Sequence, residues 1–220
     1  VEDFRSSIDK ASARIRLPKN ITAHKFILEG MQAEWIIPHN PLKDKVLLYI
    51  HGGGFISGSC LTHRMHVAKF AGKCQLKSLV FNYRLAPEHP FPAAPDDCKT
   101  AYKWLLEQGY KPQNIVVGGE SAGATLTLSL LLALKAENIP LPCAAFSISP
   151  VADLSCSAKS FGYNAPKDVA PMGSWIVWTQ MYIGSNDIKN PILSPLFGDY
   201  KGLPPLYICV GTHEIHFDDC

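Results

Sequence analysis

The sequence lacks several features that mark other classes of protein. Lysine and arginine are scattered, and 21 basic against 19 acidic residues leave a formal charge of only +2. So small a charge gives little electrostatic attraction for nucleic acid or for an acidic membrane surface. No signal peptide is recognised, and no apolar run approaches the roughly 18 residues of a membrane span. We therefore expect no nucleic-acid partner and no stable membrane insertion.

Metal and disulfide signatures are also missing. The seven cysteines show neither a C-x-x-C pair nor metal-ligand spacing. An odd number without such spacing is typical of reduced thiols, so we expect no metal site and mostly buried, unpaired cysteines in a cytoplasmic protein. A pairing of Cys143 with Cys156 stays open as the alternative.

What the sequence does contain is a serine in a strand–turn–helix context. Gly119-Glu120-Ser121-Ala122-Gly123 follows the apolar run 114–118 and precedes a helical stretch from Ala124. The two glycines permit a sharp turn that lifts the serine above the sheet edge, as a nucleophile elbow requires. The first N–H groups of the following helix can face an oxyanion. The pattern predicts Ser121 as a nucleophile and Ala122 as an oxyanion donor.

A second glycine-rich segment lies upstream. His51-Gly52-Gly53-Gly54-Phe55 directly follows the predicted buried strand Val46–Ile50. Three glycines leave backbone N–H groups uncovered, and such groups stabilise a negative oxygen. A flexible turn and a phosphate loop are the alternatives, but the phosphate-loop spacings are absent here. We predict that Gly53 and Gly54 donate to the oxyanion and that His51 supports the loop.

The order of elements predicts an α/β fold. Short β-rich runs alternate with helical stretches, which is typical of a mostly parallel sheet with helices on both faces. We expect one domain over residues 1–220 that opens with an antiparallel pair. The predicted strands are 22–28, 33–37, 46–50, 78–82, 115–118, 144–149 and 206–211, and the predicted helices are 62–72, 95–108, 122–137 and 173–183.

More than fifty residues separate the last two predicted strands, too many for a simple crossover. They include the predicted helix Gly173–Ile183, which carries Trp175 and Trp178. Packing on the body of the protein and a lid over the active site both fit this helix, and we expect both. We predict cap elements at about 1–20 and 155–200, and substrate contacts from Phe55, Trp175 and Trp178.

Several of these motifs together resemble the hormone-sensitive-lipase branch of the α/β-hydrolase carboxylesterases. The resemblance runs from about Ala33 to Asp219, with Glu120 in place of a frequent aspartate and His216 in place of an apolar residue. It implies an α/β-hydrolase fold with a helical cap, and hydrolysis of short- or medium-chain esters without a cofactor. The matching segments are His51–Phe55, Tyr83–Ala94, Gly119–Gly123, Ser194–Phe197 and Gly202–Pro205.

The acid of a catalytic triad is expected after the strand 206–211, because this fold has the order serine, acid, histidine. Glu214 aligns with the acid of the relatives and would orient an imidazole. Asp218 is the second candidate for the acid, although it could instead cap a helix. Asp219 is the third candidate.

No histidine occupies the position that this order requires. Every histidine precedes the serine or flanks the acid, and for these we expect surface or structural roles. We therefore expect that the 220 residues are part of a longer chain, that the C-terminal strand and helix of the fold are absent, and that this polypeptide alone is nearly inactive.

The sequence as a whole predicts a serine carboxylesterase that forms an acyl-enzyme on Ser121, with a small ester as its partner and a homodimer as a possible assembly. An amide or peptide hydrolase of the same fold is one alternative, because the elbow does not separate these reactions. A non-catalytic ligand receptor related to the family is the other.

Overall fold

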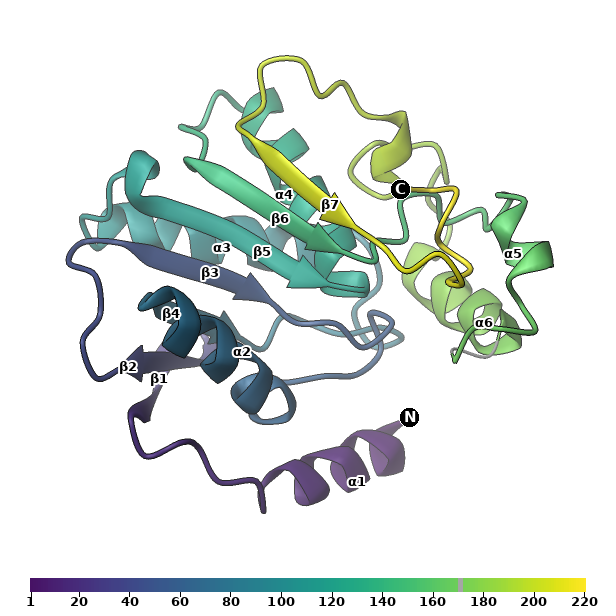
Figure 1. The fold of residues 1–220 in the computed structure, drawn as a ribbon. Helices are drawn as coiled ribbons and strands as arrows, with labels where there is room; N and C mark the ends of the chain where they lie inside the picture. Colours follow the sequence, from purple (N-terminus) through teal and green to yellow (C-terminus); the bar gives the residue numbers. More distant parts are fainter. Residues whose placement is uncertain (170–171) are drawn as a thin grey trace.

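A computed structural model describes residues 1–169 and 172–220 (Figure 1). Its strands form one seven-stranded sheet in the order β1-β2-β4-β3-β5-β6-β7. The strands are β1 Ile21–Leu28, β2 Met31–Pro38, β3 Val46–Ile50, β4 Lys77–Phe81, β5 Ile115–Glu120, β6 Ala144–Ile148 and β7 Leu206–Cys209. The helices are α1 Glu2–Ser12, α2 Cys60–Cys74, α3 Ala93–Glu107, α4 Ala122–Ala136, α5 Ser160–Tyr163 and α6 Met172–Ile183, with short 3₁₀ turns at Pro112–Asn114 and Pro195–Phe197.

The predicted α/β architecture is confirmed. The strands from β4 through β3, β5 and β6 to β7 run parallel, whereas β1 pairs antiparallel with β2 and β2 with β4. Predicted and observed ends differ by one or two residues at most strands. Along the parallel strands the largest differences are two residues: β5 continues to Glu120, and β7 ends at Cys209, since the N–H of Gly211 turns to the side chain of Glu214.

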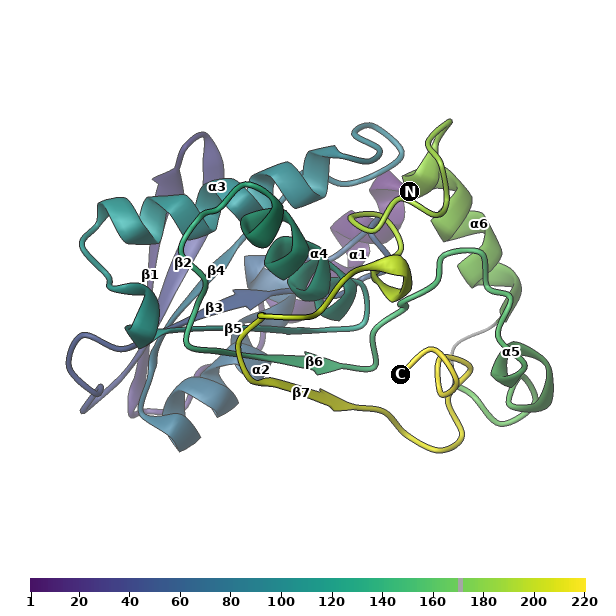
Figure 2. The same ribbon diagram turned by 90° about the horizontal axis from the view of Figure 1, so that it is seen from above.

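Helices cover both faces of the sheet, as predicted. All five residues of β3 are buried, which is typical of a central parallel strand. Leu48 and Ile50 pack in the cluster beneath α3 and α4, whereas Leu47 and Tyr49 pack with α2 on the other face. Figure 2 shows this layering, with α3 and α4 above the sheet and α2 below it. The alternation along one strand therefore fills two cores.

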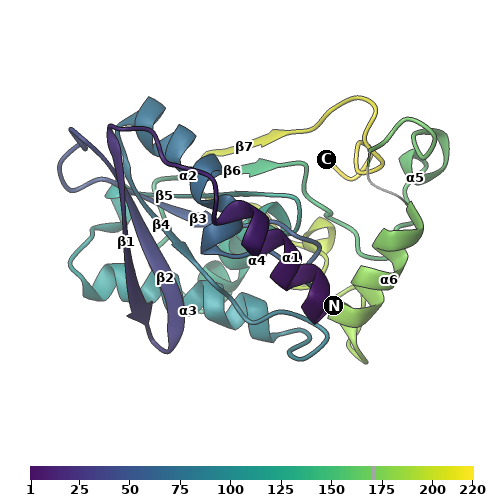
Figure 3. The same cartoon turned by 90° about the horizontal axis from the view of Figure 1, so that it is seen from below.

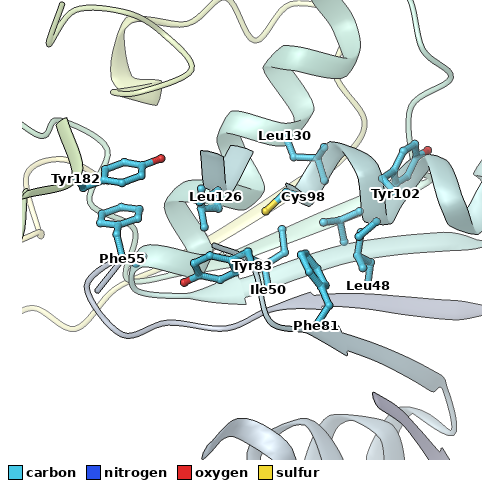
Figure 4. Close-up of a cluster of buried hydrophobic side chains, with 14 of the residues drawn as sticks. Leu48, Ile50, Phe55, Phe81, Tyr83, Cys98, Tyr102, Leu126, Leu130 and Tyr182 are labelled. Carbon is cyan, nitrogen blue, oxygen red and sulfur yellow. The ribbon is translucent and has the colours of Figure 1, made fainter. Parts of the chain in front are cut away.

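The larger core extends from the sheet to the helix α6. Figure 4 shows Leu126 and Leu130 of α4 above the sheet, and the ring of Phe55 lying face to face with that of Tyr182 from α6. Burying a leucine or phenylalanine side chain contributes about 1.5–3 kcal/mol. This contact ties α6 to the body of the protein.

The segments predicted as a cap lie around the carboxyl ends of the parallel strands. Helices α5 and α6 lie beyond these strand ends in both Figure 1 and Figure 2. Helix α1 lies next to the start of α2 (Figure 3) and has no buried residue. Polar contacts hold it: Arg5 donates to the carbonyl oxygens of Ile56 and Ala86, both at 2.6 Å, and Asp9 accepts from Ser59 at 2.7 Å.

The cysteines are unpaired, and the alternative pairing of Cys143 with Cys156 is not formed. The expectation that most of them are buried was wrong, since only Cys60 and Cys98 are fully buried. Cys74 is exposed because it lies in the last turn of α2, and Cys143 because it precedes β6 at the surface. Among the described helices, none has the length and hydropathy of a membrane span.

Candidate active site

The elbow around Ser121 has the strained geometry that its sequence predicts. β5 ends at Glu120, α4 begins at Ala122, and Ser121 between them has φ 54° and ψ −125°. Non-glycine residues adopt positive φ values rarely, and strained backbone conformations of this kind cluster at functional sites. A Cβ atom added at Gly119 or Gly123 would lie 2.4 or 2.1 Å from the carbonyl oxygen of Ile50. Only glycine allows the elbow to approach the end of β3 this closely.

The glycine loop after β3 is in direct contact with this elbow. A Cβ atom added at Gly52 would lie 3.2 Å from Cβ of Ser121. Gly53 and Gly54 have φ values of 122° and 64°, which favour glycine. Within residues 1–169 and 172–220, the N–H groups of these two glycines donate no hydrogen bond. Ala122 opens α4, where the first N–H groups have no acceptor in the helix. Backbone donors therefore lie unused beside a partly exposed serine.

His51 supports the loop from within the core. It is fully buried, its Nδ1 lies 2.8 Å from the carbonyl oxygen of Gly52, and its ring stacks on Tyr83 with centroids 4.2 Å apart. Burial, reinforced by the nearby charge of His63, lowers the pKa of His51 to about 3. The ring is therefore neutral at pH 7 and too weakly basic to act as a general base.

The three predicted substrate contacts differ in exposure. Trp178 is partly exposed and lies over Gly54, where an added Cβ atom would be 2.7 Å from its Cε3. Trp175 is buried behind it, with ring centroids 5.6 Å apart. Phe55 has no exposed surface and stacks on Tyr182 at 3.9 Å. This corrects the expectation for Phe55, whose positive φ of 64° turns the side chain into the core.

Glu214 and Asp218 have different surroundings. Oε1 of Glu214 accepts from the N–H of Gly211 at 2.7 Å and from Oγ of Ser149 at 2.9 Å. No hydrogen bond to its Oε2 occurs in the described part of the chain, so this oxygen can accept from an imidazole. Asp218 instead accepts from the N–H of Ser160 at 2.9 Å and from the hydroxyl of Tyr163 at 2.8 Å. Its capping role on α5 therefore favours Glu214 as the acid.

His216 takes the place of an apolar residue. Its ring packs edge-on against Trp175 at 4.6 Å and against Phe161 at 5.4 Å. Burial lowers its pKa to about 4, and neither ring nitrogen has a hydrogen-bond partner among the described atoms. None of the histidines in the described ranges is hydrogen-bonded to Ser121 or Glu214, nor do His, Cys, Asp and Glu form a cluster there that could hold a metal ion.

Sequence reasoning missed a group behind the glycine loop. Glu120 accepts hydrogen bonds from the N–H of Gly52 and from Nε2 of His63, at 2.6 and 2.9 Å. The only signal was the position of Glu120 directly before the serine. His63 comes from the first turns of α2, and nothing in its local sequence marks it.

Comparison with known sequences identifies the family of the chain. The sequence profile of the α/β-hydrolase fold family matches residues 47–220. An acetyl-hydrolase from Streptomyces hygroscopicus is 39% identical over 188 residues, which cover 85% of this chain and 62% of that protein. An esterase from Acinetobacter venetianus is 37% identical over 177 residues, which cover 80% of this chain and 58% of that protein. The chain thus spans less than two thirds of the length of both relatives.

Comparison with solved structures supports the fold. An esterase/lipase from an uncultured bacterium superposes with a TM-score of 0.93 at 40% identity. The matched region covers 99% of this chain and 73% of that protein's chain. An esterase from the bacterial hormone-sensitive lipase family gives a TM-score of 0.94 at 37% identity, with coverage of 99% and 74%. The chain therefore belongs to the α/β-hydrolase fold family, in the branch that resembles hormone-sensitive lipase.

Proposed function

We propose that the full-length protein is a serine carboxylesterase that hydrolyses short- to medium-chain acyl esters through an acyl-enzyme on Ser121. One observation carries the proposal: a strained, partly exposed serine touches a glycine loop in which the N–H groups of Gly53 and Gly54 donate no hydrogen bond within the described residues. The relatives named as esterases and acetyl-hydrolases support ester hydrolysis. Crystals of one similar protein, EstE5, were soaked with p-nitrophenyl butyrate, which makes a butyrate ester a suitable first substrate to test.

The reaction begins with the ester carbonyl oxygen facing the N–H groups of Gly53, Gly54 and Ala122. A histidine outside residues 1–220 accepts the proton of Ser121 while Oγ attacks the carbonyl carbon, and the alcohol leaves with that proton. Water then attacks the acyl-enzyme, and the acid leaves as Ser121 regains its proton. Glu214 orients the imidazole through its unused oxygen. Each oxyanion donor contributes about 3 kcal/mol to transition-state stabilisation.

The acyl chain lies beneath the cap in this proposal. Helices α1, α5 and α6 make up the cap, and the indole of Trp178 over Gly54 walls the pocket next to the oxyanion donors. Trp175 and Phe55 support this wall from behind, because both are buried. Removal of the Trp178 ring should therefore raise KM more than it lowers kcat.

Hydrolysis of p-nitrophenyl butyrate by full-length Ser121→Ala tests the proposal. We expect turnover to fall by several orders of magnitude, because the nucleophile is lost. Ser129→Ala is a matched control on the same helix: its hydroxyl donates only to the carbonyl oxygen of Thr125, at 3.0 Å. Retention of wild-type turnover by Ser121→Ala would end the proposal.

The cellular setting completes the proposal. We place the protein in the cytoplasm, which the unpaired state of all seven cysteines supports. A small-molecule ester is the expected partner, with no nucleic acid and no membrane insertion. A homodimer is proposed as the assembly, and light scattering of the full-length protein would measure it.

A further inference from the structure

A single, partly buried carboxylate links the nucleophile elbow to the glycine loop. Glu120 is the last residue of β5 and directly precedes Ser121. Its Oε1 accepts from the N–H of Gly52 at 2.6 Å and from Nε2 of His63 at 2.9 Å, and its Oε2 accepts from the hydroxyl of Tyr49. Three donors from the loop, from α2 and from β3 therefore converge on the residue next to the nucleophile.

We propose that Glu120 is a positioning residue for ester hydrolysis: it fixes the oxyanion loop against the elbow, and His63 holds its carboxylate in place. The inference rests on the proposed function, because it assigns a role in that reaction. Glu120 acts through Gly52 and does not touch the substrate, whereas Ser121 and the oxyanion donors contact the substrate directly.

The contact is close enough for Glu120 to determine where the loop lies. A Cβ atom added at Gly52 would lie 2.8 Å from the backbone oxygen of Glu120 and 2.9 Å from its Oε1. A hydrogen bond from an N–H group to a carboxylate is roughly twice as strong as one between neutral groups. Gly53 and Gly54 follow directly, so a shift of Gly52 moves the donors that face the oxyanion.

The surroundings of Glu120 keep it charged. Its side chain is 18% exposed and that of His63 is 19% exposed. Burial alone would raise the pKa of Glu120, but the hydrogen bonds from His63, Tyr49 and Gly52, together with the charge of His63, lower it below its usual value. Burial and the neighbouring carboxylate raise the pKa of Tyr49, so its hydroxyl stays protonated and donates. The carboxylate is therefore ionised at neutral pH and fully engaged.

His63 is itself held rigidly. It lies in the first turn of α2, where Ser59 and Thr62 form a reciprocal capping box. Its Nδ1 lies 2.8 Å from Oγ1 of Thr62 and 3.4 Å from the carbonyl oxygen of Ser59. The ring therefore presents Nε2 to Glu120 from a fixed helix end. His66, one turn further along, stacks on Phe70, lies tilted against Tyr49, and makes no hydrogen bond to Glu120 within the described residues.

The test compares full-length Glu120→Ala, Glu120→Gln, His63→Gln and the matched control His66→Gln. For each, kcat and KM for p-nitrophenyl butyrate are measured per active site, with the sites counted by complete fluorophosphonate labelling. The inhibition constant of a trifluoromethyl ketone is measured as well, because its hemiketal oxyanion needs the same N–H groups. Urea unfolding shows which variants are folded.

For Glu120→Ala we expect kcat per labelled site to fall about tenfold to a hundredfold, as when an oxyanion donor is misplaced. KM should change little, and the inhibition constant should rise by the same factor as kcat falls. Glu120→Gln keeps an oxygen for the N–H of Gly52 without the charge, so its loss should be smaller. His63→Gln should show a loss in both readouts, and His66→Gln should match the wild type.

A purely structural role for Glu120 would lower only the number of labelled sites. Unchanged kcat per site and an unchanged inhibition constant in both Glu120 variants would overturn the inference, as would equal losses in His63→Gln and His66→Gln. If the wild-type protein neither hydrolyses the ester nor is labelled at Ser121, the proposed function itself fails. The two failures are thus distinguishable.

Discussion

Gly54 offers a prediction whose magnitude can be worked from the structure. The residue has a φ of 64°, and an added Cβ atom would lie 2.7 Å from Cε3 of Trp178. A side chain at such a φ costs about 1–2 kcal/mol in the backbone alone. The clash must also be relieved by a shift of the indole or of the loop. A loop shift that removes one oxyanion donor costs about 3 kcal/mol of transition-state stabilisation.

Gly54→Ala should therefore lower kcat for p-nitrophenyl butyrate by about a hundredfold or more in the full-length protein. Trp178→Ala should recover part of this loss in the double variant, because it removes the clash and leaves only the backbone strain. A double-mutant cycle over the four proteins gives the coupling energy between the two positions. We predict that the double variant loses less transition-state stabilisation than the sum of the losses in the two single variants.

Gly30→Ala is the matched control. Gly30 has a φ of 85° in the turn between β1 and β2, and an added Cβ atom would meet nothing within 4 Å. This variant should lose about 1–2 kcal/mol of unfolding free energy and keep the wild-type kcat. Wild-type activity in Gly54→Ala, or additive losses in the double variant, would refute the assignment of the glycine loop as the oxyanion site.

Three further predictions follow from the described contacts. Glu214→Gln should lower kcat by about 10⁴-fold, because the acid that orients the imidazole is lost. Asp218→Asn should lower only the free energy of unfolding, because Asp218 caps α5. Comparable kcat losses in both variants would contradict the assignment of Glu214 as the acid. Phe55→Ala should cost about 3–5 kcal/mol in urea unfolding, because it empties the space beneath Tyr182, and a cost below 1 kcal/mol would contradict this packing. Burial lowers the pKa of His216 from 6.5 to about 4. As pH falls from 6.5 towards 4, the unfolded state therefore binds a proton on this residue before the folded state does. The free energy of unfolding should decrease over this range by on the order of 3 kcal/mol. His216→Leu should remove this part of the acid dependence of unfolding, and an unchanged profile would show that His216 is already protonated or exposed.

Local sequence was sufficient to predict the elbow and the sheet. Ser121 lies between an apolar strand and an apolar helix. The flanking glycines were recognisable in the sequence, and in the structure a side chain at either position would clash with the carbonyl oxygen of Ile50. Topology supplies the contact with the glycine loop, because β3 and β5 are neighbouring parallel strands whose carboxyl ends meet at one edge of the sheet. Both features depend on backbone geometry, which residue type constrains strongly.

Side-chain direction could not be predicted in the same way. Phe55 follows three glycines, and the inward direction of its ring depends on its positive φ and on the tertiary contact with Tyr182, neither of which the local sequence specifies. The capping of α5 by Asp218 and the bond between His63 and Glu120 join residues far apart in the chain. The exposure of Cys74 and Cys143 depends on where α2 and β6 meet the solvent. Such contacts leave no periodic signal in the sequence.

Labelling of the full-length protein with a fluorophosphonate, followed by peptide mapping, tests the central claim most directly. Because Ser121 is activated and accessible in this account, we predict one adduct per chain, on the peptide that contains Ser121, and none in Ser121→Ala. An adduct on another residue, or an active esterase whose Ser121 remains unlabelled, would contradict the account.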